Sequence, residues 1–329
     1  MSHPEYRGKT VLVTGGLGFI GSNLALALVE AGADVTVIDA LIPQHGGDQY
    51  NVETVRSRLR VEVADLRDHA ALLPLVLGKD YIFHLAGQVS HGDSMRDPEL
   101  DLSVNCVATI CLVEACRRHN PGAILVNTST RQVYGRPRTL PVDEDHPVDP
   151  VDVNGINKLA AEYYHILYHR VYGLRSVVLR LTNTYGPRQQ ITNERQGMTG
   201  VFLCRALRGE RLRLYGTGRQ VRDFTYVDDV VEALLEAAIT PACHGRIFNL
   251  GANDRHSLLD FCDILKGLCG AQYDVVPFPA DSRLIDIGDY YGSFARFHAA
   301  TGWSPRIGLE EGITRSVAFF RQHSAHYLA

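Results

Sequence analysis

The sequence predicts an α/β protein built on a doubly wound parallel sheet, followed by a smaller and less regular C-terminal lobe. Short β-rich runs alternate with longer helical patterns over residues 1–181, as in proteins whose parallel strands are joined by helical crossovers. Several of these runs, such as TVLVT and YIFHL, are almost continuously apolar, which is typical of parallel strands buried on both faces. After residue 181 this rhythm changes.

The strands and crossover helices of the sheet follow one another in a regular order. The β-rich runs predict strands at Thr10–Thr14, Asp34–Asp39, Arg60–Ala64, Tyr81–Leu85, Ala123–Asn127 and Ser176–Leu181. The longest helical patterns between them predict helices at Gly18–Ala31, Leu102–Arg118 and Ile156–Tyr172, each long enough to connect two parallel strands.

A second lobe is expected from residue 182 onward. Loops rich in Gly, Pro and polar residues there separate short helices from short strands such as RLRLYG and YDVVPF. We therefore expect two domains, at 1–181 and 182–329, with a segment at about 224–250 returning to the first sheet.

Composition and charge exclude several classes of protein. Hydrophobic residues make up 45% of the 329, and 33 basic against 37 acidic residues give a net charge of −4 without basic blocks. Nucleic acid is therefore not an expected partner. No apolar stretch of about 18 residues predicts a membrane span, and the N-terminus lacks the apolar core of a signal peptide. The seven cysteines include no C-x-x-C pair, so we expect a cytoplasmic protein without disulfides or a metal site.

A glycine-rich turn directly after the first strand predicts a dinucleotide site. Residues 10–21 read TVLVTGGLGFIG, with Gly15, Gly18 and Gly21 leading into a helix. Such glycines permit a tight turn, a close approach of the backbone to a diphosphate, and close packing of helix on strand, which is the Rossmann arrangement. Asp39 ends the next strand, where a ribose-binding acid belongs. Because no Lys or Arg adjoins Asp39, NAD is favoured over NADP. Asp65 and Leu66 end the third strand, where an adenine edge would lie; Asp65 equally fits a residue that only terminates the strand.

Four motifs occur in order along the chain, namely the spacing G-x-x-G-x-x-G, HLAGQ (His84–Gln88), TSTRQVYG (Thr128–Gly135) and RDFTYVDD (Arg222–Asp229). Together they resemble the extended short-chain dehydrogenase/reductase family, in its branch of NAD-dependent nucleotide-sugar epimerases and dehydratases. The resemblance covers essentially the whole chain. It implies further NAD contacts from Phe19, Ile20 and Leu85, and a homodimer formed through the helices at 102–118 and 156–172.

The resemblance also implies a catalytic set, from which this sequence departs at one position. Thr130 stands at the family's Ser/Thr position, ahead of Tyr134-Gly135. The family's Tyr-x-x-x-Lys pair corresponds to VNGINK, which places Lys158 at the lysine and Asn154 at the tyrosine. An asparagine cannot ionise and so cannot be the general base. Either another residue has taken over this role, or the protein is a weakly active relative.

The loop GQVSHGDS (Gly87–Ser94) supplies candidates near the substrate. His91 is a candidate replacement base, because an imidazole titrates near neutrality; the alternative is an ordinary exposed loop histidine. Ser94 is a candidate substrate contact. Arg131 stands where relatives have a small residue and suits a sugar carboxylate or phosphate, with a plain surface arginine as the alternative.

On the substrate side, the resemblance assigns positions around a nucleotide diphosphate. They are Asn183 in RLTNTYGPRQ, Tyr215, Arg222 in RDF, and Arg283 in DSRLID. A planar guanidinium suits two adjacent phosphates. The base and the sugar cannot be deduced from the sequence.

The residues after Thr130 narrow the reaction. In the 4,6-dehydratases an Asp-Glu pair follows the Ser/Thr, and decarboxylating relatives have a Glu where Gln132 stands; this chain has Arg131-Gln132. We therefore expect an NAD-dependent nucleotide-sugar epimerase that inverts C4 through a transient keto-sugar. The alternatives are a C2 epimerase, a dehydratase or decarboxylase of the same family, or an NAD- and nucleotide-sugar-binding relative with weak catalysis.

Overall fold

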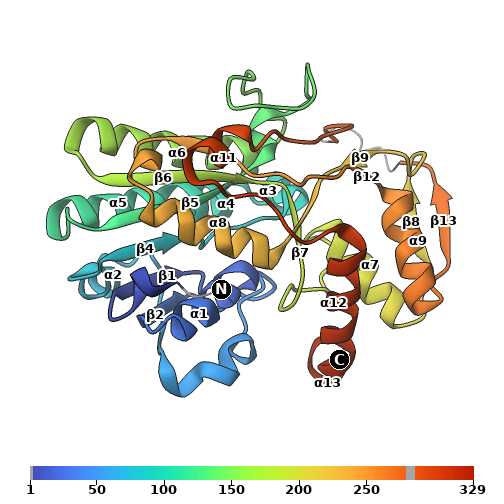
Figure 1. Ribbon diagram of the computed structural model, residues 1–329, viewed down its shortest axis with the longest axis horizontal. Helices are drawn as coiled ribbons and strands as arrows, with labels where there is room; N and C mark the ends of the chain where they lie inside the picture. Colours follow the sequence, from blue (N-terminus) through green and yellow to red (C-terminus); the bar gives the residue numbers. More distant parts are fainter. Residues whose placement is uncertain (1–2, 279–285) are drawn as a thin grey trace.

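A seven-stranded parallel sheet forms the centre of the computed structural model, which describes residues 3–278 and 286–329 (Figure 1). Its strand order is β11-β6-β5-β4-β1-β2-β3. The strands are β1 (Thr10–Thr14), β2 (Asp34–Asp39), β3 (Arg60–Val63), β4 (Tyr81–His84), β5 (Ile124–Thr130), β6 (Arg175–Leu181) and β11 (Ile247–Asn249). The order runs outward from β1 in both directions, so the prediction of a doubly wound α/β sheet is confirmed.

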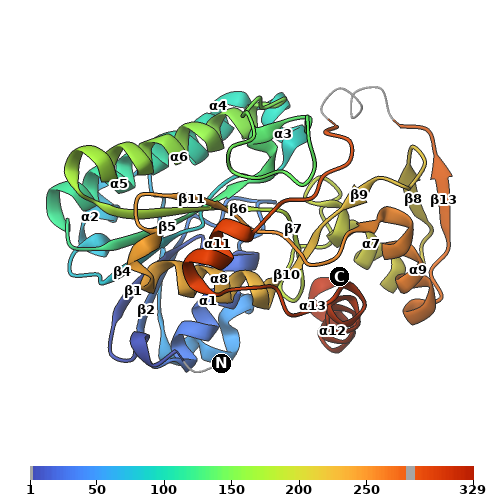
Figure 2. The same cartoon turned by 45° about the horizontal axis from the view of Figure 1, so that its top comes forward.

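Helices cover both faces of this sheet (Figures 1 and 2). One face carries α1 (Phe19–Glu30) and α8 (Val227–Ile239), and the other carries α2 (His69–Val76), α5 (Ala108–His119) and α6 (Val153–Tyr172). Successive side chains of β1 point to opposite faces: Val11 and Val13 belong to the core beneath α1 and α8, and Leu12 to the core beneath α2 and α5. This alternation explains the continuously apolar run, because each strand is buried on both sides.

Elements after β6 form a second group at one end of the sheet, on the right of Figure 1. Its strands pair as β7 (Asn183–Tyr185) with β10 (Phe224–Tyr226), β8 (Leu212–Tyr215) with β13 (Tyr273–Val276), and β9 (Val221–Arg222) with β12 (His256–Ser257). Its helices include α7 (Met198–Leu207), α9 (Leu258–Cys269) and α12 (Leu309–Gln322). Between these elements the chain returns to the central sheet, where α8 packs on one face and β11 pairs with β6.

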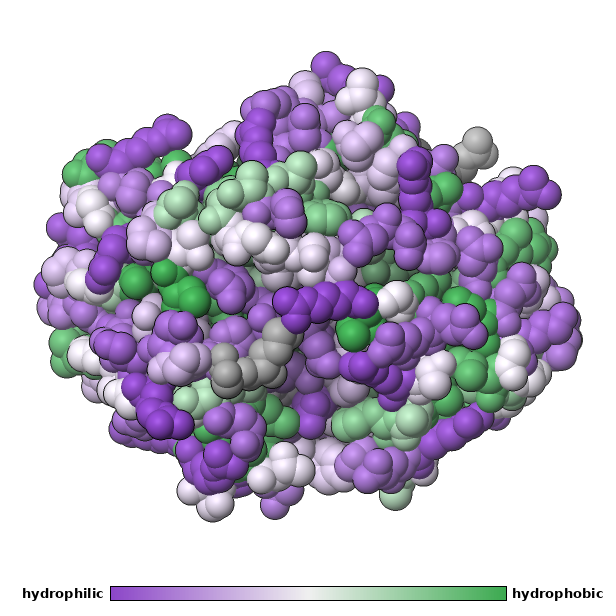
Figure 3. Space-filling model, in the orientation of Figure 1, coloured by the Kyte–Doolittle hydropathy of each residue, from purple (hydrophilic) through white to green (hydrophobic). Residues whose placement is uncertain are grey.

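Short helices complete the described chain. They are the α-helices α3 (His91–Arg96), α4 (Pro98–Leu102), α11 (Ala295–Thr301) and α13 (Ser324–Tyr327), and the 3-10 segments η1 (Pro4–Tyr6), η2 (Gln49–Arg58), η4 (Arg131–Tyr134) and η5 (Pro241–Cys243). No helix in these residues is both long and apolar enough to cross a membrane. On the face shown in Figure 3, hydrophobic residues form small groups among hydrophilic ones.

Three elements differ from the sequence prediction by more than one residue at an end, each for a local reason. β5 continues to Thr130 because its pairing with β6 extends to Leu181. α6 begins at Val153 because the Asp152 side chain caps it, accepting from the amide of Gly155 at 2.7 Å. The helix expected at 102–118 is instead α4, a π-helical turn at Ser103–Val107, and α5. Asn105 lies in this π turn and forms two hydrogen bonds with Gln88. Its Oδ1 accepts from the Gln88 amide, and its Nδ2 donates to the Gln88 carbonyl.

A buried ion pair connects the sheet to α6. The guanidinium of Arg180 on β6 donates two hydrogen bonds to Glu162, at 2.6 and 2.9 Å, and a third to the Tyr134 hydroxyl at 2.6 Å. The two charged side chains are 5% and 0% exposed. Removing one charge would therefore leave the other buried without compensation.

We expect Glu162→Gln to lower the free energy of unfolding by about 3–5 kcal/mol, the usual cost of breaking one half of a buried pair. Urea unfolding measures the loss. The control is Glu311→Gln, which breaks the exposed pair with Arg315 on α12 and should cost less than about 1 kcal/mol. Equal stability of the two variants would contradict this account of the core.

Candidate active site

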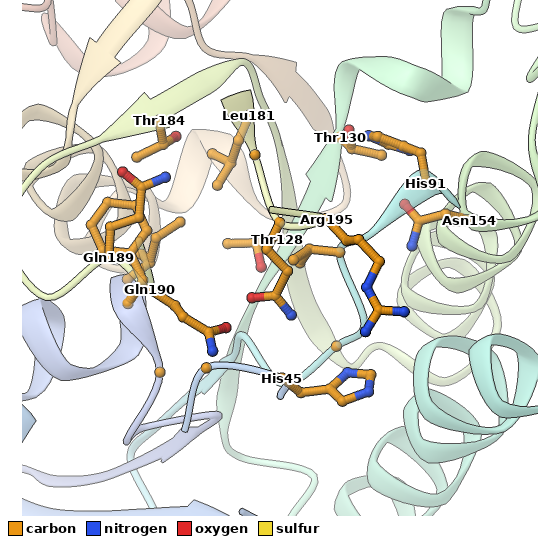
Figure 4. A pocket seen from close by; sticks show the side chains of 18 of the residues that line it. His45, His91, Thr128, Thr130, Asn154, Leu181, Thr184, Gln189, Gln190 and Arg195 are labelled. Carbon is orange, nitrogen blue, oxygen red and sulfur yellow. The ribbon is translucent and has the colours of Figure 1, made fainter. Parts of the chain in front are cut away.

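A cavity of about 710 Å³ lies at the carboxyl ends of the strands, between the sheet and the second group of elements. Its wall includes the turn after β1, the ends of β2 and β5, the start of α6, and residues of α7 and β8. In a doubly wound sheet this edge is the usual place for a ligand. Figure 4 shows part of the wall.

The glycine turn leaves no space for side chains at the cofactor end of the cavity. Gly15 has a φ of +65°, and a Cβ there would lie 2.8 Å from the backbone nitrogen of Ala86. At Gly21 a Cβ would lie 2.1 Å from the Gly15 oxygen. Gly18 is the N-cap of α1 and offers no side chain to the first amides of that helix. Phe19 and Ile20 follow it in the cavity wall. A helix N-terminus presented in this way suits a diphosphate.

Asp39 lies at the end of β2, in the same wall. Its carboxylate accepts from the amides of Leu41 at 2.9 Å and Leu17 at 3.2 Å. Burial raises the pKa of Asp39, and the opposing effects come from these two amides rather than from a cation. An acid in this setting can accept from ribose hydroxyls and would repel a 2′-phosphate. The glycine turn and Asp39 therefore fit NAD.

Three further residues expected at the cofactor, Leu85, Leu66 and Asp65, also line the cavity. The carboxylate of Asp65 forms an ion pair with Arg67, with Oδ2 2.5 Å from Nη2. That hydrogen bond to Arg67 lowers the pKa of Asp65. The carboxylate of Asp65 is therefore already hydrogen-bonded to a side chain of the protein, that of Arg67.

Thr130 and Lys158 also line the cavity. Thr130 is the last residue of β5, and its hydroxyl accepts from the amide of Gln132 at 3.2 Å. Lys158 lies in the second turn of α6 and is 8% exposed. Burial lowers the pKa of Lys158 to about 8, although the charges of Asp101 and Glu162 oppose the shift.

Asn154 lies one turn before Lys158, and its side chain is held by the protein. Its Nδ2 donates to the Gln88 carbonyl at 2.8 Å and to Asp101 Oδ2 at 3.1 Å. Its backbone amide donates to Ser94 Oγ at 3.2 Å. Asn154 lines the cavity, whereas Ser94 is fully buried and is not in its described wall. The structure thus places Ser94 behind the cavity, joining α3 to α6, and not where a substrate contact was expected.

His91 is the first residue of α3 and lines the cavity beside Thr130, with Asn154 nearby (Figure 4). Its side chain is 35% exposed, and its Nδ1 lies 3.0 Å from Oδ2 of the fully buried Asp152. The structure therefore does not place His91 on an open loop.

Two arginines, Arg131 and Arg222, also line the cavity. Arg131 donates to Asn183 Oδ1 at 2.9 Å, and its guanidinium lies 5.4 Å from the ring centroid of Tyr290. It is a wall residue, so the alternative of a plain surface arginine is wrong. Arg222 is 7% exposed; burial, and then the charge of Arg131, lower the pKa of Arg222 to about 10.

Other expected substrate residues are placed as follows. Asn183 lines the cavity and donates to the backbone oxygen of Asp223 at 3.0 Å. Tyr215, at the end of β8, lines the cavity and is 40% exposed. Arg283 lies outside the described residues.

Sequence reasoning missed residues that complete the wall or support it. Gln189, Gln190 and Arg195 line the cavity from the loop after β7 (Figure 4). Asp152 and Asp101 stand behind it. Of these residues, Asp152 had a recognisable sequence signal, because it is an acid a few residues before the predicted helix at 156–172 and could cap it. Within the described chain, one group of potential metal ligands, His3, Glu232 and Glu236, lies outside the cavity wall.

The altered pKa of Lys158 can be measured directly, because the chain contains only four lysines. We expect an NMR titration of the lysine side chains to show one amine with a midpoint near pH 8, about two units below a free lysine. Lys158→Arg should remove that signal and so assign it. Below this midpoint the charged amine strengthens anion binding in the cavity, and the gain is lost as the pH rises through it. A midpoint above 10 would contradict the burial of this amine.

Comparison with known proteins agrees with this geometry. Residues 11–251 match the NAD dependent epimerase/dehydratase family. The chain is 34% identical over 315 residues to a UDP-glucose 4-epimerase of Mycolicibacterium smegmatis, covering 95% of this chain and 99% of that protein. It is 32% identical over 323 residues to UDP-glucuronic acid decarboxylase 1 of Xenopus tropicalis, covering 97% of this chain and 73% of that protein.

A solved structure shows the same fold. The UDP-glucose 4-epimerase of Thermus thermophilus, in complex with NAD, superposes with a TM-score of 0.84 at 32% identity and covers 95% of this chain and 99% of its own. Because the family match extends over most of the chain and the described cavity has the glycine turn and acid that NAD requires, the protein belongs to the NAD-dependent epimerase/dehydratase family.

Proposed function

We propose that this protein is an NAD-dependent nucleotide-sugar epimerase that inverts the configuration at C4 of the sugar. The supporting observation is that one cavity contains both halves of such a site. Gly15, Gly18, Asp39, Thr130 and Lys158 all line it. We assign the first three to its NAD-binding part, and Thr130 and Lys158 to its reactive end. In this proposal residues 1–181 form the NAD-binding domain. Residues 182–329 form mainly the nucleotide-sugar lobe, and the segment at about 224–250 returns to the first domain.

Each wall residue has a defined task in this reaction. Bound NAD⁺ supplies reversible hydride acceptance, so that the sugar is oxidised to a 4-keto form and reduced again from the other face. Lys158 binds the nicotinamide ribose and holds positive charge near the developing oxyanion. Thr130 accepts or donates a hydrogen bond at the reacting hydroxyl. Asn154 contributes to the wall beside this hydroxyl and takes no proton.

The residues after Thr130 favour epimerisation over the related eliminations. Elimination of water across C5 and C6 requires an acid and a base on that side of the sugar. Arg131 and Gln132 follow Thr130, and neither can act as a carboxylate. C2 epimerisation, decarboxylation and binding with weak catalysis are the remaining alternatives.

The decisive experiment incubates the purified protein and NAD⁺ with a panel of nucleotide sugars, followed by NMR. The panel contains uridine, thymidine, cytidine and guanosine diphosphate sugars, and it includes carboxylated sugars because Arg131 lines the cavity next to Thr130. Appearance of the C4 epimer supports the proposal. Inversion at C2, loss of water or loss of CO₂ would replace it with the corresponding alternative. Binding of a sugar nucleotide without any product would identify a weak relative.

Arg222 is proposed to pair with the substrate diphosphate. Arg222→Ala should weaken nucleotide-sugar binding by roughly 1.5–3 kcal/mol, the range for hydrogen bonds to charged groups, and leave NAD affinity unchanged. Calorimetry with the nucleoside diphosphate and, separately, with NAD measures both effects. An equal loss for the two ligands would indicate a general disturbance of the wall, and no loss would place Arg222 outside the diphosphate site.

We also propose a homodimer formed through α5, α6 and the π turn before α5. Several apolar side chains on these elements are 41–55% exposed, namely Val107, Ile156, Tyr163 and Leu167. Light scattering at micromolar concentration should give the mass of two chains, and Leu167→Glu should shift it toward one. The control is Val275→Glu on β13, an equally exposed position in the second group of elements. A monomer for the unmodified protein would contradict the proposal.

A further inference from the structure

We propose that His91 and Asp152 form a catalytic pair in which His91 is the general base of the reaction and Asp152 positions its imidazole. This inference rests on the proposed function, because it names the group that removes the proton from the reacting hydroxyl. Asn154 cannot remove this proton. The inference assigns the proton transfer to two residues that are 61 positions apart in the chain.

Of the described wall residues Thr130, Arg131, Asn154, Lys158 and His91, His91 is the one good proton acceptor at neutral pH. Thr130 is a neutral hydroxyl and Asn154 a neutral amide, and neither takes a proton at neutral pH. Arg131 remains protonated, and the amine of Lys158 is mainly protonated below its pKa of about 8. An imidazole can both take and return a proton in this range. His91 lies in the wall beside Thr130 (Figure 4), where a substrate hydroxyl that reaches Thr130 also approaches the imidazole.

Asp152 is held rigidly behind the imidazole. Its side chain is 0% exposed, and Oδ1 accepts from the amide of Gly155 at 2.7 Å as the N-cap of α6. Oδ2 accepts from Gln132 Nε2 at 3.0 Å and lies 3.0 Å from His91 Nδ1. Burial acts to raise the pKa of Asp152, but the contacts with His91, Gly155 and Gln132 lower it below its ordinary value. Asp152 is therefore negatively charged, and its Oδ2 faces Nδ1 of the imidazole.

The backbone of His91 is also fixed against α6. Ser94 Oγ donates to the His91 carbonyl at 2.8 Å and accepts from the amide of Asn154 at 3.2 Å. The Ser90 side chain caps α3 by accepting from the amide of Asp93. His91 Nδ1 stands at contact distance from Asp152 without full hydrogen-bond alignment, as catalytic pairs often do before substrate binds. A proton on Nδ1 leaves Nε2 as the acceptor.

The proposed step balances without a further reagent. The lone pair of Nε2 takes the proton of the C4 hydroxyl, the C–O bond becomes C=O, and the hydride from C4 passes to NAD⁺. The imidazolium that forms is stabilised by the charge of Asp152. When the hydride returns to the other face of the carbonyl carbon, the imidazolium gives the proton back to the oxygen.

Several charged groups lie on the elements near the imidazole. They are Asp152 at the N-cap of α6, Lys158 on α6, Arg131 on η4, Asp101 on α4, and Asp93 on α3, which forms an ion pair with Arg195 at 3.1 Å. Among residues 3–278 and 286–329, Asp152 is the acid within ion-pair distance of His91. Its removal should therefore disfavour the imidazolium.

The test compares His91→Asn and Asp152→Asn in the protein with NAD bound. His91→Asn should lower turnover by about 10²–10⁴-fold and abolish the acid limb of the pH–rate profile. Asp152→Asn keeps an oxygen that can cap α6, so it should fold, while the acid limb moves to lower pH and turnover falls. Two controls match these changes. Asp68→Asn alters the aspartate that caps α2, and His119→Asn alters an exposed histidine at the end of α5; both should keep the profile.

A second measurement does not depend on turnover. NMR titration of the histidine rings, with the His91 signal assigned by its loss in His91→Asn, should show a lower midpoint for His91 in Asp152→Asn and no change in Asp68→Asn. An unchanged midpoint would overturn the pairing, and an intact acid limb in His91→Asn would overturn its role as the base. Absence of any turnover by the unmodified protein, by contrast, would reject the proposed function and leave the pairing to be judged by the titration alone.

Discussion

The cap at the N-terminus of α6 is the interaction on which the reactive end of the cavity depends. The Asp152 carboxylate accepts from the amide of Gly155 and thereby decides where the helix starts. Asn154 and Lys158 follow at fixed positions one turn apart, on the side of α6 that faces β5 and the cavity. The same carboxylate accepts a hydrogen bond from the side chain of Gln132 on η4 and lies 3.0 Å from Nδ1 of His91 on α3. One buried charge therefore sets the relative positions of three elements that are distant in the sequence.

Buried charges elsewhere in the site are balanced by specific partners. Asp101 is fully buried and accepts from the side chains of Asn154 and Asn157, at 3.1 and 2.8 Å. Its charge supports the protonated form of Lys158 against the effect of burial. Glu162, farther along the same helix, forms the buried pair with Arg180 on β6 and so holds α6 to the sheet. These groups give the cavity wall a fixed electrostatic character before any ligand enters, which is the condition for stabilising charge as it develops.

The asparagine at position 154 has a structural role as well as a chemical one. The Nδ2 group bridges the Gln88 carbonyl and Asp101, two acceptors that a tyrosine hydroxyl at the same Cα cannot reach together, because its ring carries the oxygen much farther from the backbone. Gln88 is held in turn by Asn105 in the π turn. The position thus belongs to a connected polar network, and such networks are stable only when every buried member has a partner.

The sequence by itself determined the fold class and the cofactor end of the site. The continuously apolar runs indicate strands that are buried on both faces of the sheet. The observed bounds of β1 and β2 are those predicted from the sequence. Gly15 and Gly21 are required by close backbone approach, a local constraint that sequence spacing records directly. Tertiary structure alone decided the rest. Ser94 turned inward because its hydroxyl joins α3 to α6, and Arg131 lines the cavity through its contact with Asn183. His91 and Asp152 lie far apart in the sequence, and no sequence pattern predicts that they are close in space. Their contact depends on how α3 packs against the start of α6, which the tertiary structure decides.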